Sequence, residues 1–147
     1  MPHYEASLSG STYSQESLEQ ADKWLKRCVE DHKHCKSVFP KPTFLPHRLI
    51  EIEGYPDVDL RIRLRDRNML DSPVAYASLS HCWGSKILFK LTRGNLKSCM
   101  EGIPFDKISK SSKTPYAFAL CVGIRYIWID SLCESVFIDG KVENISN

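Results

Sequence analysis

The sequence lacks a large excess of either charge. Its 147 residues include 20 lysines and arginines against 18 aspartates and glutamates, which leaves a formal net charge of +2. A protein that binds nucleic acid or an anionic membrane through its electrostatic field needs a stronger basic surplus. Charge therefore predicts no partner, and in particular no nucleic acid.

Long apolar segments are also missing. No run approaches the roughly 20 apolar residues that a transmembrane helix needs. Residues 1–10 contain no basic stretch followed by an apolar one, the pattern of a secretory signal. The sequence predicts a cytoplasmic protein without a membrane partner. In that compartment the six cysteines are expected to be free thiols or metal ligands rather than disulfide partners.

A glycine-rich phosphate loop is absent as well. The seven glycines never form the pattern G-x-G-x-x-G, so no spacing in the chain indicates a bound dinucleotide. The apolar content of 42% is nevertheless enough for one hydrophobic core in a chain of this length.

The first part of the chain predicts a tail, a helix and an extended connection. Residues 1–16 are rich in serine and poor in aliphatic side chains, so we expect a mobile tail. From Ser17 to Cys35, apolar residues recur at steps of three and four, the period of one amphipathic helix. The prolines between positions 40 and 46 then require an extended segment. Residues 17–70 are assigned to this leader helix and a β-hairpin region.

The hairpin is predicted over residues 48–64. Residues 48–53 are rich in apolar side chains, and from Val58 to Leu64 apolar residues alternate with charged ones. Such alternation is typical of a strand with one face in water. Residues 54–57, Gly-Tyr-Pro-Asp, supply the turn chemistry between the two runs.

Strands and helices alternate in the remainder. Residues 74–80 and 125–129 have the composition of strands, and the second is almost wholly β-branched or aromatic. Residues 95–100 and 116–122 have the pattern of helices. This order predicts an α/β fold with a partial parallel sheet flanked by helices, preceded by an N-terminal helix and a β-hairpin.

Three blocks rich in cysteine, histidine and aromatic residues follow one another along the chain. They are Cys28-x3-His32-x2-Cys35, Tyr76-Ala-Ser-Leu-Ser-His-Cys-Trp-Gly84 and Arg125-Tyr-Ile-Trp-Ile-Asp-Ser-Leu-Cys133. Together they resemble the fungal heterokaryon incompatibility (HET) domain, which shows a Cys/His-containing leader, an L-S-[YH]-C-W-G block and an R-Y-[IL]-W-I-D-S-L-C block. The last two blocks are rich in tryptophan, cysteine and aromatic residues, which are among the rarer ones, so their joint presence is a specific signal. The resemblance covers about residues 24–133.

The resemblance implies a module of non-self recognition and cell-death signalling that acts through protein partners or self-association. HET domains look distantly similar to TIR domains, some of which cleave NAD, so NAD is a candidate substrate of complete family members. The resemblance further implies that residues 71–133 are the N-terminal half of the domain. Family members continue past the cysteine with a segment like I-I-Q-D-D, which residues 134–147 lack. We therefore expect an inactive or partial copy, truncated after the first half of the domain, whose tail is translated from a retained intron, since residues 133–135 can be encoded with a splice-donor sequence.

One departure from the family concerns the helix between the last two blocks. Members open this helix with a sequence like P-K-T-F-x-D-A, whereas Pro115 stands where the family usually has alanine. Because proline lacks an amide hydrogen, we expect this helix to start late or to be distorted.

The first block admits two interpretations. Cys28, His32 and Cys35 are spaced i, i+4 and i+7, which places them on one face of the predicted helix, and thiolates with imidazole are zinc ligands. A structural zinc site needs a fourth ligand. Further histidines are available as that ligand at His34, His47 and His81. Alternatively, the two cysteines pack as small apolar residues and His32 binds a carbonyl.

The second and third blocks predict a site at the carboxyl ends of two parallel strands, where α/β sheets place their ligands. The candidate catalytic residues are Ser80, His81, Cys82 and Asp130, and the candidate cofactor-binding residues are Trp83 and Gly84. In that interpretation His81 is a base and Cys82 a nucleophile. In the alternative, Cys82 and Trp83 lie in the core, His81 lies on the surface and Asp130 caps a helix.

Two functional hypotheses follow, with a third in which the product is inert. In the first, the chain is a non-self recognition and cell-death signalling module. In the second, it is a small zinc-binding interaction adaptor built on Cys28, His32 and Cys35. Nicotinamide release from NAD would separate the first hypothesis from the others.

Overall fold

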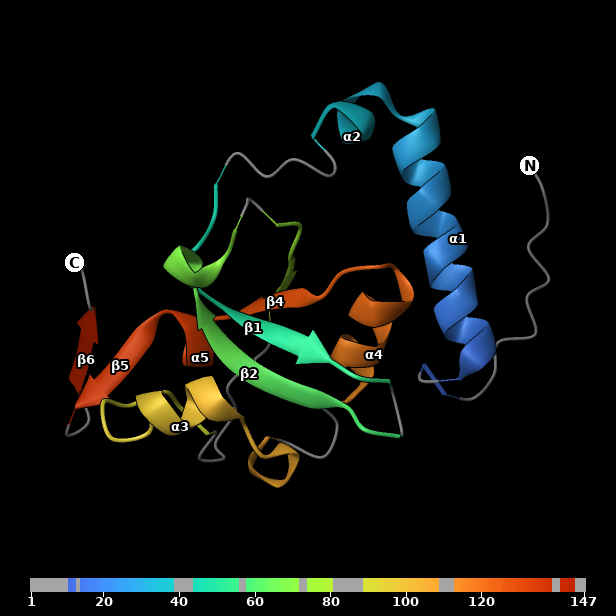
Figure 1. Ribbon diagram of the computed structural model, residues 1–147. Coiled ribbons are helices and arrows are strands. Elements are labelled where there is room, and N and C mark those ends of the chain that lie inside the picture. The colour runs from blue at the N-terminus through green and yellow to red at the C-terminus, as the bar shows by residue number, and fades with distance from the viewer. Residues whose placement is uncertain are drawn as a thin grey trace.

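A four-stranded sheet forms the centre of the protein. The computed structural model describes residues 11–12, 14–38, 44–55, 58–71, 74–80, 89–108, 113–138 and 141–144. The strands of the sheet are β1 (Arg48–Glu53), β2 (Arg61–Asp66), β3 (Ala77–Leu79) and β4 (Tyr126–Ile129), in the order β2-β1-β4-β3 (Figure 1). β1 pairs antiparallel with β2 and β4, whereas β3 and β4 are parallel. The predicted α/β class is confirmed, and the parallel part of the sheet is the β3–β4 pair.

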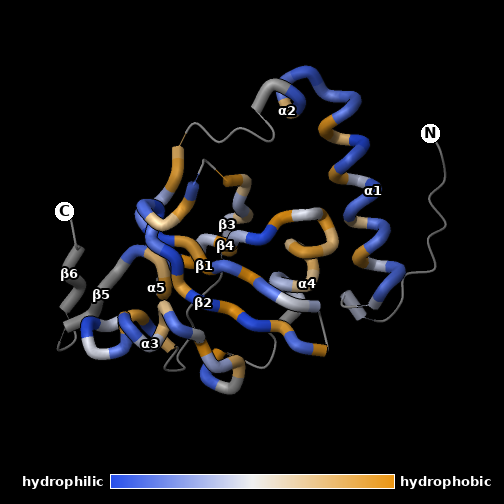
Figure 2. The backbone as a smooth tube through the Cα atoms, in the orientation of Figure 1, coloured by the Kyte–Doolittle hydropathy of each residue, from blue (hydrophilic) through white to orange (hydrophobic). Residues whose placement is uncertain are grey.

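The predicted hairpin is confirmed as β1 and β2, and both strands belong to the central sheet. Ile50 lies opposite Leu64, and Ile52 lies opposite Ile62. All four side chains are buried, while the residues between them are charged, so hydrophobic and hydrophilic positions alternate along the strands (Figure 2). The two-residue period therefore directs one face of the hairpin to the core.

The loop of the hairpin is longer than the predicted turn. β2 begins at Arg61 rather than Val58. Gly54 adopts a φ of 83°, a left-handed conformation that favours glycine, and a β-carbon there would lie 2.5 Å from the carbonyl oxygen of Asp59. The Asp59 carboxylate accepts a hydrogen bond from the amide of Tyr55 at 2.9 Å. These contacts stabilise the loop, and β2 begins only after it, at Arg61.

Three helices contribute to the core beside the sheet. They are α3 (Leu96–Glu101), α4 (Lys113–Cys121) and α5 (Asp130–Cys133) (Figure 1). Each contributes buried residues to the cluster that also contains the inward side chains of β1, β2 and β4. The core side chains from these helices and the segments that follow them are Cys99, Ile103, Tyr116, Ala119, Ile124, Leu132 and Cys133. One hydrophobic core therefore joins the hairpin to the rest of the chain.

The helix with Pro115 is regular and begins early. α4 starts at Lys113, so the proline lies in the first turn, where an amide hydrogen has no partner inside the helix. Because a proline fits in this turn, α4 starts three residues before the predicted residue 116. At the other end, the amides of Gly123 and Ile124 donate to the carbonyls of Leu120 and Ala119, at 3.0 and 2.7 Å. This is a Schellman motif, and it uses the φ of 76° at Gly123.

The leader forms two helices instead of the single helix predicted from Ser17 to Cys35. α1 (Gln15–Asp31) begins after Ser14, whose hydroxyl accepts the amide of Ser17 at 3.2 Å, and α2 (Lys33–Val38) follows after a break at His32. His32 is extended, with φ −102° and ψ 112°. The predicted start of order near Ser17 agrees with α1, while most of the predicted tail lies outside the described residues.

α1 lies beside α4, at the end of the molecule opposite the final hairpin (Figure 1). The Cys121 thiol lies 3.5 Å from the carbonyl oxygen of Leu18. No side chain of α1 is fully buried, and hydrophobic and hydrophilic residues alternate along it in the helical pattern (Figure 2). Among the described residues, no helix has the length and apolar character needed to cross a membrane.

The last described residues form a second, two-stranded sheet that the sequence analysis missed. β5 (Ser135–Ile138) pairs antiparallel with β6 (Lys141–Asn144), and Ile138 lies opposite Lys141. The sequence between the strands is Asp-Gly, a dipeptide that is typical of two-residue hairpins. The Asp-Gly dipeptide was the sequence signal from which this hairpin could have been predicted.

Candidate functional site

The second and third sequence blocks lie side by side. Ala77 pairs with Ile127 and Leu79 with Ile129 in the parallel β3–β4 ladder. Ser80 and Asp130 each follow the last paired residue of their strand, so their backbones leave the sheet at the same edge. Adjacent strands are about 4.8 Å apart. The predicted convergence of the two blocks at the carboxyl ends of parallel strands is therefore confirmed for these two residues.

Asp130 takes part in the start of a helix. It is the first residue of α5, and its Oδ1 accepts a hydrogen bond from the amide of Ser131 at 2.7 Å. The carbonyl of Ser131 in turn accepts the amide of Leu91 at 3.0 Å, which attaches residues 89–92 to this end of the sheet. Asp130 is partly buried, whereas Ser80 is exposed. The N-cap of α5 is Ile129 and makes no side-chain capping bond, so Asp130 is not the cap that the alternative predicted, and its chemical role stays a prediction.

The remaining residues of the predicted catalytic site are not among those described. His81, Cys82, Trp83 and Gly84 all fall within residues 81–88. The proposed pairing of a histidine base with a cysteine nucleophile, and the proposed cofactor contacts, therefore stay predictions.

The predicted metal ligands come together at the corner between α1 and α2. Cys28 Sγ lies 3.3 Å from His32 Nδ1 and 3.5 Å from Cys35 Sγ, and the three ligand atoms all lie within 4.8 Å of one another. The hydrogen bond to Cys35 raises the pKa of the Cys28 thiol. His34 and His47, two of the candidate fourth ligands, are described but do not belong to this group. The third candidate, His81, is outside the described residues.

A comparison with protein families assigns the part of the chain around the β3–β4 pair. Residues 76–135 match the family model described as Heterokaryon incompatibility protein (HET). We call these matched residues the HET segment. The match begins at the first residue of the second block and includes the last residue of the third, so the predicted resemblance is confirmed over this range. Comparisons with curated proteins and with solved structures gave no match.

The HET segment contains β3, α3, α4, β4 and α5, and β1 and β2 precede it. β1 nevertheless lies between β2 and β4, and Ile50 pairs with Ile127 of the segment. The core of the HET segment is therefore completed by a hairpin from outside it.

Arg48 connects this hairpin to the third block of the HET segment. Its guanidinium donates from Nε to the carbonyl of Cys133 at 3.0 Å and from Nη2 to the carbonyl of Glu134 at 3.3 Å. Only 7% of Arg48 is exposed. A cation at the end of a helix stabilises carbonyls that have no partner within the helix. No local pattern in the sequence predicts this contact, because its partners lie 85 and 86 residues away.

The cysteine that ends the third block is a core residue. Cys133 is 2% exposed, and its sulfur lies 3.4 Å from the amide nitrogen of Ile129. Burial raises the pKa of the Cys133 thiol to about 12. Since the thiolate is the reactive form of cysteine, Cys133 in the HET segment is an unreactive packing residue at neutral pH.

A charged network covers the other face of the hairpin and reaches β4 of the HET segment. Arg63 Nε and Arg65 Nε lie 2.7 and 2.6 Å from Glu51 Oε2, and Arg63 also pairs with Glu53. The Tyr126 hydroxyl donates to Glu51 Oε1 at 3.3 Å. Partial burial would raise the pKa of Glu51, but the hydrogen bonds and charges of the two arginines outweigh it and lower that pKa. The alternating charges of residues 51–65 were the sequence signal for this network.

Replacing Glu51 with glutamine should remove an acid-sensitive contribution to stability. Because the folded-state pKa of Glu51 is lowered, its ion pairs stabilise the fold above the unfolded pKa of about 4.3 and are lost as pH falls through the folded value. We expect E51Q to lose about 1 kcal/mol at pH 7, the size of a few partly exposed ion pairs. Urea unfolding at a series of pH values should show this difference shrinking below about pH 4.

The matched control is E101Q, which neutralises an exposed carboxylate on α3. It should unfold like the unmodified protein at each pH. A difference between E51Q and the unmodified protein that stays constant from pH 7 to pH 3 would contradict the assigned network.

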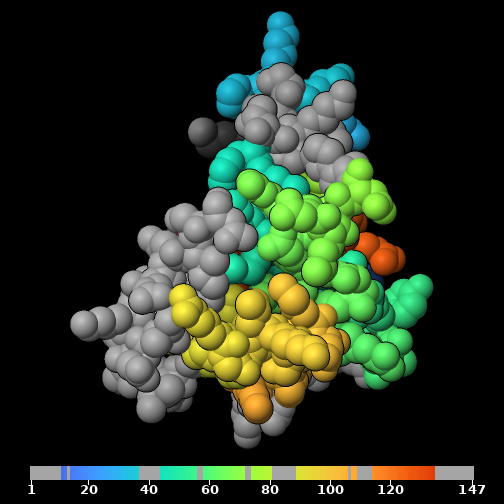
Figure 3. Space-filling view, turned by 60° about the vertical axis from the view of Figure 1, so that its left-hand side comes forward, coloured from blue at the N-terminus to red at the C-terminus, as the bar shows by residue number. Residues whose placement is uncertain are grey.

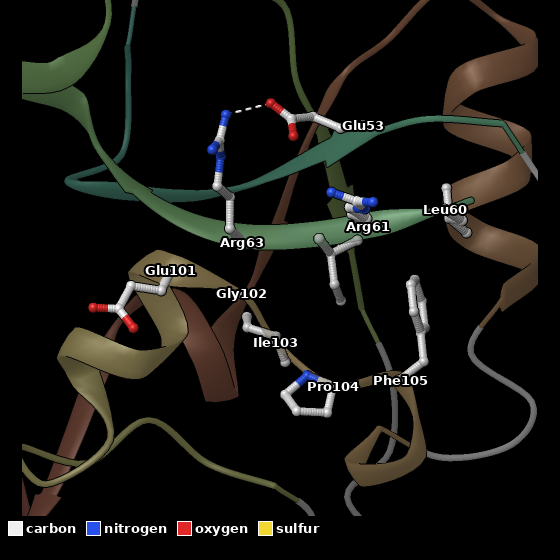
Figure 4. Close-up of a pocket in the computed structure, with 10 residues that line it drawn as sticks. Glu53, Leu60, Arg61, Arg63, Glu101, Gly102, Ile103, Pro104 and Phe105 are labelled. Carbon is white, nitrogen blue, oxygen red and sulfur yellow. Dashed lines mark hydrogen bonds and ion pairs between the residues drawn. The ribbon is translucent and has the colours of Figure 1, made fainter.

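A cavity of about 480 Å³ lies at the opposite edge of the sheet from β3. Its walls are the start of β2 at Arg61 with the preceding Leu60, and the segment that leaves α3, with Pro104 and Phe105 (Figure 4). The amide of Ile103 donates to the carbonyl of Ile62 at 2.8 Å and holds that segment at the edge of β2. β2 and α3 also adjoin on the surface (Figure 3). Of the predicted site residues that the structure describes, none lines this cavity.

Proposed function

We propose that the chain acts in fungal non-self recognition and cell-death signalling, through binding to other proteins or to itself in the cytoplasm. The observation that carries this proposal is the HET match over residues 76–135, which coincides with the parallel pair β3–β4. The near-neutral net charge of +2 also favours protein partners over nucleic acid.

The edge of the sheet at β3 supports self-association. β3 is the last strand in the sheet order, and among the described residues its outer edge pairs with no strand. An unpaired edge offers backbone donors and acceptors to another chain. We therefore propose that the signal is transmitted by assembly.

We do not propose chemistry at Asp130 as the source of the signal, since its carboxylate already accepts the amide of Ser131. In the assembly mechanism the Asp130 carboxylate only accepts this amide within the first turn of α5. The alternative is a catalytic Asp130 in a NAD-cleaving site, as in some TIR domains. The two alternatives differ in what a neutral substitution at this position does.

Inducible expression in a filamentous fungus tests the proposal. We expect growth arrest and uptake of a vital dye in cells that express the chain, and no nicotinamide release when the purified protein is incubated with NAD. D130N keeps a side-chain oxygen for the Ser131 amide but removes the charge, so it should cause the same arrest. D71N, on an exposed loop residue, is the matched control.

Normal growth with the protein present on an immunoblot would contradict the signalling role. The assembly mechanism would be wrong, and catalysis would be the source of the signal, under two joint results. One is loss of arrest in D130N but not in D71N, and the other is nicotinamide release by the unmodified protein.

A further inference from the structure

The corner between α1 and α2 has the geometry of a metal site. A continuous helix rises 1.5 Å per residue, so residues seven positions apart are separated by about 10 Å along its axis. The Sγ atoms of Cys28 and Cys35 are nevertheless 3.5 Å apart. The extended conformation of His32 ends α1 and turns α2 back, which closes this distance. The break in the leader helix thus brings the three ligand atoms together.

The separations between these atoms are close to those that zinc requires. Tetrahedral zinc bonds sulfur at about 2.3 Å and nitrogen at about 2.0 Å, which places two sulfurs about 3.8 Å apart and sulfur about 3.5 Å from nitrogen. The observed distances are 3.5 Å between the sulfurs and 3.3 Å from Cys28 Sγ to His32 Nδ1. Shifts of a few tenths of an ångström suffice to admit the ion.

The chemistry of the ligand set also favours zinc. Two thiols and one imidazole are soft or borderline ligands, which bind zinc in preference to magnesium or calcium. The two cysteines are partly buried and His32 is exposed, so the group is open to solvent on one side. Three protein ligands with an open fourth position are typical of zinc sites that hold an exchangeable water.

We propose that Cys28, His32 and Cys35 bind one zinc ion, with water as the fourth ligand, and that the ion fixes the angle between α1 and α2. Binding releases the two thiol protons to solvent. Because the cluster lies outside the HET segment, this site stands independently of the proposed signalling function.

Cobalt titration of the whole chain tests the site directly. The protein is purified free of metal with a phosphine reductant, so that the thiols stay reduced, and Co²⁺ is added. We expect one equivalent to bind, with the visible bands of tetrahedral cobalt and a thiolate charge-transfer band, and one equivalent of Zn²⁺ to bleach both. Zinc should also slow amide hydrogen exchange in α2, because it restrains the corner.

Variants identify the ligands. C28S, H32Q and C35S should each weaken zinc binding by more than the 10–100-fold that loss of a supporting contact costs. H34Q and C121S are matched controls, since neither residue belongs to the cluster, and both should bind like the unmodified protein. The three ligand variants should retain the circular dichroism of the fold, because the corner is not part of the core.

Three results would overturn the proposal. One is the absence of stoichiometric cobalt or zinc binding. Another is binding that survives in all three ligand variants, and the last is equal loss of binding in H34Q or C121S.

Discussion

Truncating Tyr116 to alanine should lower the free energy of unfolding by about 3–5 kcal/mol, the range for removing a buried aromatic side chain. Tyr116 has no exposed surface, and its ring packs edge-on against Phe105, with centroids 5.7 Å apart. The side chain belongs to the core cluster to which α4 and the strands of the sheet contribute. In a domain of this size the loss corresponds to a fall in melting temperature of about 10 °C or more, which calorimetry can measure.

Tyr116→Phe separates the ring from the hydroxyl. Within the described part of the chain, the buried hydroxyl has no hydrogen-bond partner. Burial also raises its pKa, so it stays protonated at neutral pH. A buried polar group without a partner destabilises the fold by about 1–3 kcal/mol. We therefore expect Y116F to be at least as stable as the unmodified protein; a loss comparable to that of Y116A would show that the hydroxyl, not the ring, is what matters.

Arg48→Ala should destabilise the fold by about 2–4 kcal/mol, because hydrogen bonds from a charged group contribute about 1.5–3 kcal/mol each and the substitution leaves two carbonyls without their donor. These carbonyls, of Cys133 and Glu134, end α5. Relative to the unmodified protein, we expect R48A to accelerate amide hydrogen exchange more in α5 than in α3. Urea unfolding at pH 7, followed by circular dichroism, measures the overall loss.

Two further variants make the Arg48 result specific. R48K retains the charge but not the planar set of guanidinium donors, so its stability should lie between that of R48A and that of the unmodified protein. R61A removes an exposed arginine from β2 and should change stability by less than about 0.5 kcal/mol. Equal stability of R48A and R61A would contradict the role assigned to the buried guanidinium.

Much of the sheet was predictable because its signals are local. Alternation in residues 58–64 predicted a strand with one buried face, and the apolar run at 125–129 predicted a buried strand; the structure contains β2 and β4 at these places. The two-residue period depends only on the pleat of a strand, so it can be recognised without knowing which strands lie next to it. The start of β2 was less predictable, because the Gly54 and Asp59 contacts shift it by three residues.

The candidate sites were predictable in composition but only partly in geometry. The spacing of Cys28, His32 and Cys35 correctly predicted that they form a cluster, but it assumed that one continuous helix carries all three. In the structure, the break at His32 brings the ligand atoms within contact distance. No residue in this stretch is a strong helix breaker, so the break had no clear local signal. The parallel pairing that brings Ser80 and Asp130 to one edge was predicted from the order of strand, helix and strand.

The sequence alone determined the α/β class, the buried and exposed faces of the strands, and the HET segment, because periodicity and residue identity within a short stretch specify each of them. Only the tertiary structure decided that the hairpin joins β4, that Arg48 binds the end of α5, and that Glu51 is shared by two arginines and Tyr126. These features join residues far apart in the chain, and their formation depends on which strands become neighbours. No local pattern encodes that choice.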